Sequence, residues 1–276
     1  MTAYSPEDAG HSPSFAVART AWRDGVQLAG ARTLPAEVGV AFTYNGGTQA
    51  VMMATPGDLE DFAVGFSLTE GIVRTVGEIE RLDVVAEPVG IELRMWLPDA
   101  SARALTERRR HNAGPTGCGL CGIESLSEAV RALPPVAEGT PVAAADIAAA
   151  LHALATLQVL NHATRAVHAA AFWRKGEGIV AVREDVGRHN ALDKLIGALA
   201  RQGVAGSSGV LLMTSRVSVE LVQKAAVAGM PFLVAVSAPT ALAVRTAEAA
   251  GITLVAVARA DGFEVFTHAR RIATAG

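Results

Sequence analysis

The second half of the chain alternates between short apolar runs and segments of helical periodicity. Aliphatic runs of roughly five to eight residues separated by helices are typical of an α/β domain with a mainly parallel sheet. A turn at 174–178 would add one antiparallel hairpin. The expected strands are 166–173, 178–183, 209–214, 231–236 and 252–258, and the expected helices are 188–202, 217–229 and 240–250.

The first half shows a different pattern, with two hairpins around one helix. Residues 37–55 predict a hairpin, because Asn45-Gly46-Gly47 between apolar runs favours a tight turn. A second hairpin is expected over 79–97. Between them we expect a helix with Thr55 as its cap and Gly71 at its end.

These patterns divide the chain into three parts. Residues 1–14 predict a flexible tail, and residues 15–138 an N-terminal α+β subdomain. Residues 139–276 predict an α/β domain, opened by an Ala-rich helix over 144–161. The boundary lies in a proline-rich stretch at 132–141, which is typical of a linker.

Composition narrows the class of protein. The 276 residues are 50% hydrophobic, which excludes a disordered chain. A net charge of −3 and a pI of about 6.2 argue against a nucleic-acid binder with a basic face. The apolar stretch 225–244 is interrupted by glycine and prolines, so we expect no membrane span. The polar N-terminus shows no secretory signal, and the expected location is cytoplasmic.

The only two cysteines are Cys118 and Cys121, within a glycine-rich loop at 114–122. They could be idle core thiols, half of a zinc site, or a nucleophilic or redox pair. The third interpretation is favoured, because positive charge and a helix N-terminus lower a thiol pKa. A basic run at 108–111 precedes the loop, and a helix start at 123–126 follows it.

Two zinc interpretations are weaker. A closed structural zinc site needs four ligands, and the chain has no second cysteine pair, so histidines would have to complete it. His168-Ala169-Ala170 is similar to the H-x-E part of the zinc deaminase pattern, but Ala170 stands where the general acid/base glutamate belongs. Hydrolytic deamination is therefore not expected, and neither is a structural metal.

Polar residues follow several expected strands. In open α/β sheets, ligands bind beyond the carboxyl ends of strands. Arginine forks suit phosphate oxygens, and helix N-termini accept anions. Together these positions predict a site for a phosphate-rich ligand. They are Asp185, Arg188, His189, Arg216, Ser218, Ser237, Thr240 and Arg259.

A purely structural interpretation also fits some of these residues. Thr240 could simply cap the following helix, and Asp185 could occupy a helix N-terminus. Asn190 and Lys194 would then lie on one solvated helix face. A single histidine in a strand, such as His168, is more often a hydrogen-bonded core residue than a catalyst.

Several stretches together resemble the FdhD family, the sulfur carrier proteins needed for formate dehydrogenase activity. The resemblance covers roughly residues 37–270. It is carried by 117–122 (GCGLCG), 184–194 (EDVGRHNALDK), 215–220 (SRVSVE), 237–240 (SAPT) and the region 55–72.

The resemblance implies a sulfurtransferase with a cytidine-deaminase-like α/β sandwich and a smaller N-terminal α+β subdomain. A cysteine desulfurase would donate sulfur to Cys118 as a persulfide, with Cys121 as its partner. The substrate would be the bis-molybdopterin guanine dinucleotide cofactor, with molybdenum or tungsten, and the client formate dehydrogenase. A homodimer is also implied. The cofactor-binding stretch would comprise Val257, Ala258, Arg259, Ala260, Asp261 and Gly262.

Two other functions stay open from the residues alone. A thiol–disulfide oxidoreductase would form a reversible Cys118–Cys121 disulfide and would need no nucleotide. A non-catalytic chaperone would hold the cofactor for its client without using the thiols.

Overall fold

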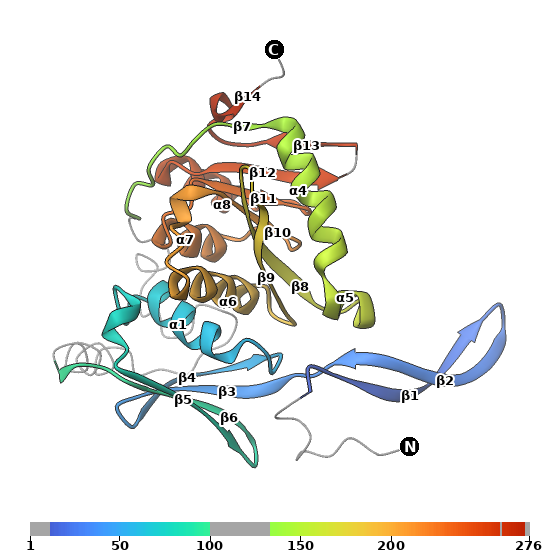
Figure 1. The fold of residues 1–276 in the computed structure, drawn as a ribbon. Coiled ribbons are helices and arrows are strands. Elements are labelled where there is room, and N and C mark those ends of the chain that lie inside the picture. The colour runs from blue at the N-terminus through green and yellow to red at the C-terminus, as the bar shows by residue number, and fades with distance from the viewer. Residues whose placement is uncertain (1–11, 100–132, 260, 274–276) are drawn as a thin grey trace.

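The computed structural model describes residues 12–99, 133–259 and 261–273. Its largest part is a six-stranded sheet in the order β13-β12-β11-β10-β8-β9 (Figure 1). The α/β alternation expected from the sequence is confirmed. The strands are β8 (His168–Arg174), β9 (Gly178–Asp185), β10 (Val210–Met213), β11 (Phe232–Ala235), β12 (Thr253–Arg259) and β13 (Gly262–Val265).

The expectation of a mainly parallel sheet is wrong. Only the β10–β11 and β11–β12 pairs are parallel, whereas β8–β9, β8–β10 and β12–β13 are antiparallel. The hairpin at 174–178 is present, but β8 also runs antiparallel to β10. β13 was not expected, and it returns from β12 by a connection too short for a parallel crossover.

Helices cover both faces of this sheet. Phe172, Leu211 and Leu233 pack on one face with α6 (Arg188–Arg201), α7 (Val219–Val227) and α8 (Ala241–Ala250). Side chains of the opposite parity pack on the other face with α4 (Ala144–Leu157). The single helix expected over 144–161 is instead broken at Gln158, where α5 (Val159–Thr164) begins.

The N-terminal part forms a four-stranded sheet in the order β4-β3-β6-β5. Both expected hairpins are confirmed, β3 (Val38–Tyr44) with β4 (Gly47–Ala54) and β5 (Arg81–Glu87) with β6 (Gly90–Trp96). Asn45 and Gly46 have positive φ angles of 46° and 79°, as a tight hairpin turn between twisted strands requires.

The expected helix between the hairpins is α1 (Leu59–Thr69), which covers one face of the four-stranded sheet. Its N-cap is Asp58, not Thr55. Thr55 instead forms hydrogen bonds with residues 185 and 186, at the end of β9 in the larger sheet. Gly71 follows the helix with a φ of 66°, as expected for a helix end.

The two sheets are joined by the crossing of α1 and α6 (Figure 1). A Cβ atom on Gly65 would lie 1.7 Å from the Asp193 carbonyl oxygen, and one on Gly197 would lie 1.8 Å from that of Asp61. No real Cβ approaches an oxygen so closely. Glycine at both positions therefore allows the two helix backbones to touch.

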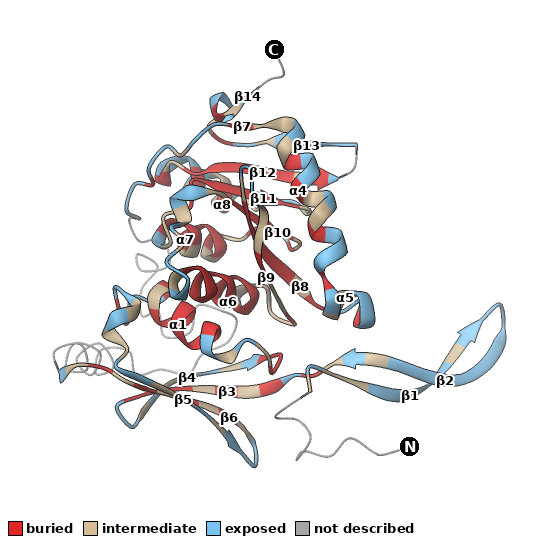
Figure 2. Ribbon diagram, in the orientation of Figure 1, coloured by how far each residue is buried: buried red, intermediate tan, exposed pale blue. Residues whose placement is uncertain are grey.

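A long hairpin projects from the body, formed by β1 (Ser14–Arg23) and β2 (Val26–Pro35) (Figure 1). The sequence pattern did not predict it. Figure 2 shows that it is mostly exposed along its length. Of the expected flexible tail, residues 1–11 lie outside the described part, and Ser14 already belongs to β1.

The remaining elements are short. Within the described ranges no helix is both long and apolar enough to cross a membrane. The position of the boundary between subdomains stays a prediction. The short elements are β7 (Val142–Ala143), β14 (Ile272–Ala273) and the 3₁₀ turns η2 (Val76–Glu78), η3 (Gly206–Ser208) and η4 (Ala269–Arg271).

Candidate functional site

The ends of four strands meet at one edge of the six-stranded sheet. Strands β10, β11 and β12 run in parallel, and the antiparallel β8–β9 hairpin brings the end of β9 to the same edge. The connections bond to one another, since Val217 N–H donates to the Ala238 carbonyl at 3.2 Å and Val257 N–H to the Ser237 carbonyl at 3.3 Å.

Most of the residues predicted to bind a ligand lie along this edge. Arg188 and His189 form the first turn of α6, and Arg216 and Ser218 precede α7. Ser237 and Thr240 precede α8, and the stretch 257–262 runs from the last residues of β12 to the first residue of β13. Ala260 lies outside the described residues.

Three arginines at this edge are not held in ion pairs by the residues that the structure describes. Arg188, Arg216 and Arg259 form no ion pair with any residue in the described ranges, and Arg216 and Arg259 are exposed. By contrast, Arg183 and Arg201 are both bound to carboxylates. The free guanidinium groups give this edge a positive character that suits phosphate oxygens.

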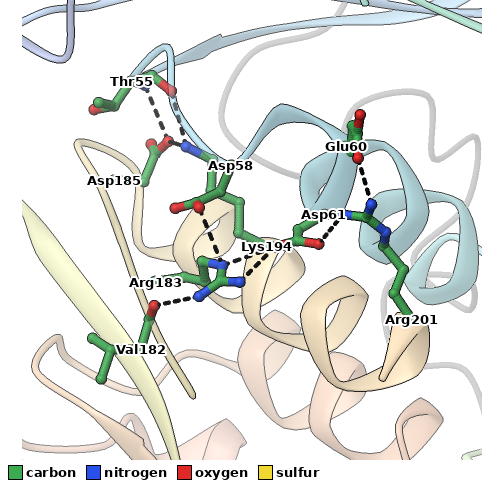
Figure 3. Close-up of polar contacts among 9 residues, drawn as sticks. All are labelled: Thr55, Asp58, Glu60, Asp61, Val182, Arg183, Asp185, Lys194 and Arg201. Carbon is green, nitrogen blue, oxygen red and sulfur yellow. Dashed lines mark hydrogen bonds and ion pairs between the residues drawn. The ribbon is translucent and has the colours of Figure 1, made fainter. Parts of the chain in front are cut away.

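Asp185 is fully buried and its two carboxylate oxygens accept four hydrogen bonds, of which Figure 3 shows those from Thr55 and Lys194. Oδ2 accepts from Lys194 Nζ at 2.6 Å and from Thr55 N–H at 3.0 Å. Oδ1 accepts from Gly187 N–H at 2.7 Å and from Asn190 Nδ2 at 2.9 Å. These contacts account for Asp185 as a link between the two sheets, without a ligand.

The expected solvated face of Asn190 and Lys194 is wrong. Both side chains are buried, because α1 and the end of β4 cover this face of α6. Lys194 Nζ also donates to the Thr55 carbonyl at 2.9 Å, and Asn190 Nδ2 donates to the Met53 carbonyl at 2.8 Å. Sequence periodicity could not reveal a second layer over the helix.

Further ion pairs flank this link. Asp61 on α1 accepts from Arg183 of β9 and from Arg201 of α6, each at 2.6 Å (Figure 3). Lys224 of α7 donates to Thr69 at 2.9 Å and lies 3.0 Å from the buried Asp193 carboxylate. These pairs could not be predicted from local charge patterns, because their members are more than 30 residues apart, or 120 or more when they cross between the sheets.

His189 is largely buried and follows Arg188 at this edge of the sheet. Burial, Arg188 and Lys224 lower its pKa to about 4, so the imidazole is neutral at physiological pH. Its Nε2 lies 3.9 Å from Glu220 Oε2, and neither atom has a hydrogen-bond partner among the described residues. Glu220 was not singled out from the sequence, although it ends the 215–220 motif.

The structure also shows the surroundings of His168, Thr240 and Ser218. His168 is half-buried at the start of β8, and burial, followed by the charge of Arg188, lowers its pKa. Thr240 caps α8, since its hydroxyl accepts from Ala243 N–H at 3.2 Å. Ser218 precedes α7 but makes no side-chain capping bond, so its hydroxyl is not used for that purpose.

Val257 has a backbone conformation that is rare for a β-branched residue. Its φ is 51°, and the β12–β13 register shifts between Ala256 and Arg259. Such outliers cost of order 1–3 kcal/mol and concentrate at functional sites. Val257 therefore lies in an irregularity of β12, and Arg259 and Asp261, which follow it, are exposed.

Cys118 and Cys121 lie outside the described residues, as do the basic run at 108–111 and the whole glycine-rich loop. The predictions made for them therefore stay predictions. Among the residues that are described, no group of three or more His, Asp or Glu side chains is arranged to hold a metal ion.

Comparison with solved structures places the fold. The crystal structure of a formate dehydrogenase accessory protein from Desulfotalea psychrophila superposes with a TM-score of 0.75. The match covers 95% of this chain and 100% of that one, at 24% sequence identity. This α/β architecture with its second, smaller sheet is therefore that of the accessory protein.

Sequence comparison is more specific. The sulfur carrier protein FdhD of Agrobacterium fabrum is 56% identical over 257 residues, covering 93% of this chain and 95% of the relative. That of Brucella abortus is 58% identical over 242 residues, covering 87% and 90%. The FdhD/NarQ family profile matches residues 35–273, and this chain belongs to that family.

Proposed function

We propose that this protein is a sulfur carrier that holds sulfur as a persulfide on Cys118 and delivers it to a molybdopterin cofactor for formate dehydrogenase. The observation that carries the proposal is the close similarity to sulfur carrier proteins over nearly the whole chain, in a protein with only two cysteines. We also propose that the protein acts in the cytoplasm, where thiols stay reduced. We further propose that it forms a homodimer.

The first step is acceptance of sulfur from a cysteine desulfurase. The Cys118 thiolate attacks the outer sulfur of a persulfide on the donor. A bond forms between Cys118 Sγ and that sulfur while the donor's S–S bond breaks, and the electron pair leaves on the donor cysteine as a thiolate. No external oxidant or reductant is consumed.

In the second step the outer sulfur passes to the metal of the substrate, the bis-molybdopterin guanine dinucleotide. The Cys118 Sγ–S bond breaks and Cys118 returns to a thiolate. The metal centre supplies the electron pair that the sulfur atom needs as a ligand, so the metal is oxidised by two electrons. Cys121 resolves a disulfide or shares the sulfur.

The sheet edge fits the phosphates of this substrate. Its diphosphate groups are anionic, and Arg188, Arg216 and Arg259 offer guanidinium groups without ion pairs in the described ranges. Arg188 Nε is buried and lacks a hydrogen-bond partner there, which a bound phosphate would supply. Val257, with its strained backbone, lies near the end of β12 at the same edge.

Intact-protein mass spectrometry tests the first step. After incubation with a desulfurase and cysteine, we expect an adduct of one sulfur atom that cyanide removes. Cys118→Ala should abolish this adduct, and the matched variant Cys121→Ala should keep it. Formation of an internal disulfide without any sulfur adduct would instead favour an oxidoreductase.

Activation of formate dehydrogenase in cells separates a carrier from a chaperone. We expect Cys118→Ala to abolish activation, because the persulfide cannot form. Full activation by that variant would show that the protein only holds the cofactor, and the carrier proposal would be abandoned.

A further inference from the structure

The β1–β2 hairpin, called the arm below, makes few contacts with its own body. Apart from its base, where Arg32 Nη2 donates to the Thr164 carbonyl at 3.4 Å, its residues are mostly exposed (Figure 2). An isolated two-stranded hairpin is marginally stable in water, and three or more strands or a packing surface are normally needed. Among the residues that the structure describes, the arm therefore lacks a packing surface that would stabilise it.

The strand register separates the arm into two unlike faces. Paired residues such as Val17 with Arg32 and Ala21 with Leu28 share one face, because side chains alternate along a strand. That face combines every arginine of the arm with most of its large apolar side chains. Its members are Phe15, Val17, Arg19, Arg23, Val26, Leu28, Arg32 and Leu34.

The net charges of the arm and of the rest of the chain indicate which surface the arginine face binds. The arm contains three arginines and one aspartate, so the rest of the chain holds 21 basic and 26 acidic residues. A positive arm on a negative body favours contact between two copies of the chain. The arm cannot make this contact with its own body, from which it extends outward (Figure 1).

The body offers a matching surface on the open face of the four-stranded sheet, opposite α1. Val51 is 63% exposed and Met53 is 53% exposed on β4. The register places Asp83, Glu87 and Glu92 on the same face, where they share two arginines. No described helix covers this face (Figure 1).

We propose that two copies of this chain pair by exchanging arms, each laying its arginine face on the partner's open sheet face at Val51 and Met53. The contact is isologous, so each copy contributes one arm and one sheet. The arginine face of one arm supplies ten residues, and the open sheet face of the same copy adds to them towards the roughly 20–30 residues that a stable interface uses on each side. This inference rests on the proposed homodimer and identifies its surface.

Sedimentation equilibrium of the full chain tests the proposal. The wild type should have twice its chain mass of 28.5 kDa. The double variant Arg19→Glu/Arg23→Glu should raise the dimer dissociation constant roughly 100-fold or more, through like-charge contacts. Thr20→Glu/Gln27→Glu, on the arm's opposite face, is the matched control and should stay dimeric. Circular dichroism should show unchanged folding in all of them.

A mixing experiment tests the sheet surface. Val51→Arg should also dissociate the dimer, because it places positive charge opposite the arm. Mixed with Arg19→Glu/Arg23→Glu, it should form a heterodimer in which one contact is charge-reversed and attractive and the other is native. Failure of the mixture to pair would overturn the proposed surface.

The outcomes separate this inference from the proposed function. A monomeric wild type would overturn both the homodimer and the arm exchange. A dimer that survives the arm charge reversal would overturn the arm exchange alone. Sulfur loading of Cys118, measured on the same variants, tests the carrier function independently.

Discussion

Asp185 and Lys194 show how a motif residue can serve the fold. Both side chains have 0% exposure and form a 2.6 Å ion pair, and both also bond to Thr55, which follows β4. The motif at 184–194 stands out in the sequence, but the sequence alone could not show whether its residues bind a ligand or stabilise the fold. The missing information was the layer packed over α6, which comes from residues about 130 positions earlier.

Replacing Lys194 by methionine should therefore destabilise the protein strongly. The variant leaves the Asp185 carboxylate buried without its cation, which typically costs about 3–5 kcal/mol. Urea unfolding would measure the change. Lys175→Met, at an exposed turn, is the matched control and should alter the free energy of unfolding by less than about 0.5 kcal/mol. Equal stability of the two variants would contradict the buried-pair account.

His189 predicts how stability depends on pH. Its pKa is about 4 in the folded protein, below the ordinary value of about 6.5. The unfolded chain thus binds more protons between these values, so stability is complete above pH 6.5 and falls as pH drops towards 4. The loss attributable to His189 should reach about 2–3 kcal/mol.

Denaturant unfolding of wild type and His189→Gln across this pH window would check the prediction. The variant lacks the titrating group, so the difference in free energy between the two proteins should change with pH. A constant difference from pH 7 to pH 4 would rule out the proposed role of His189.

Individual elements were predictable where local pattern decides them. The β3–β4 turn at Asn45-Gly46 and the Thr240 cap follow from nearby residues alone. Strand direction was not, because β8 pairs with β10, which lies about 40 residues further along the chain. The arm was missed because its small and polar residues give no strong apolar alternation.

The crossing of α1 and α6 gives a prediction for an element pair. Gly65→Ala should push the helices apart, because the new methyl group would overlap the Asp193 carbonyl. We expect a loss of about 1–3 kcal/mol or more from overpacking, despite the better helix propensity of alanine. Gly57→Ala is a suitable comparison, since nothing lies within 4 Å of a Cβ there. A stabilised Gly65→Ala variant would contradict this packing.

At the scale of the whole molecule, the sequence predicts the α/β class and the sheet edge that carries Arg188, Arg216 and Arg259. The proposed function depends on the family resemblance, because neither the arginines nor the histidines could specify it alone. The sulfur-bearing Cys118 stays a prediction from sequence, since it lies outside the described residues.

The whole chain should unfold in one step. The two sheets share ion pairs between α1, β9 and α6, so neither can lose its structure without exposing charges buried in the other. We expect coincident denaturation curves from far-ultraviolet circular dichroism and tryptophan fluorescence. Two separated transitions would show that the sheets are energetically independent.

The glycine contact between α1 and α6 also has a consequence for truncation. A fragment consisting of residues 139–276 alone would carry Lys194, Asn190 and the bare backbone groove at Gly197 on its surface. The fragment contains a complete six-stranded sheet with its helices, but the face of α6 that is normally buried would be exposed to solvent. Expression of that half by itself should therefore yield aggregated protein, because α1 and the end of β4 would no longer shield α6 from solvent.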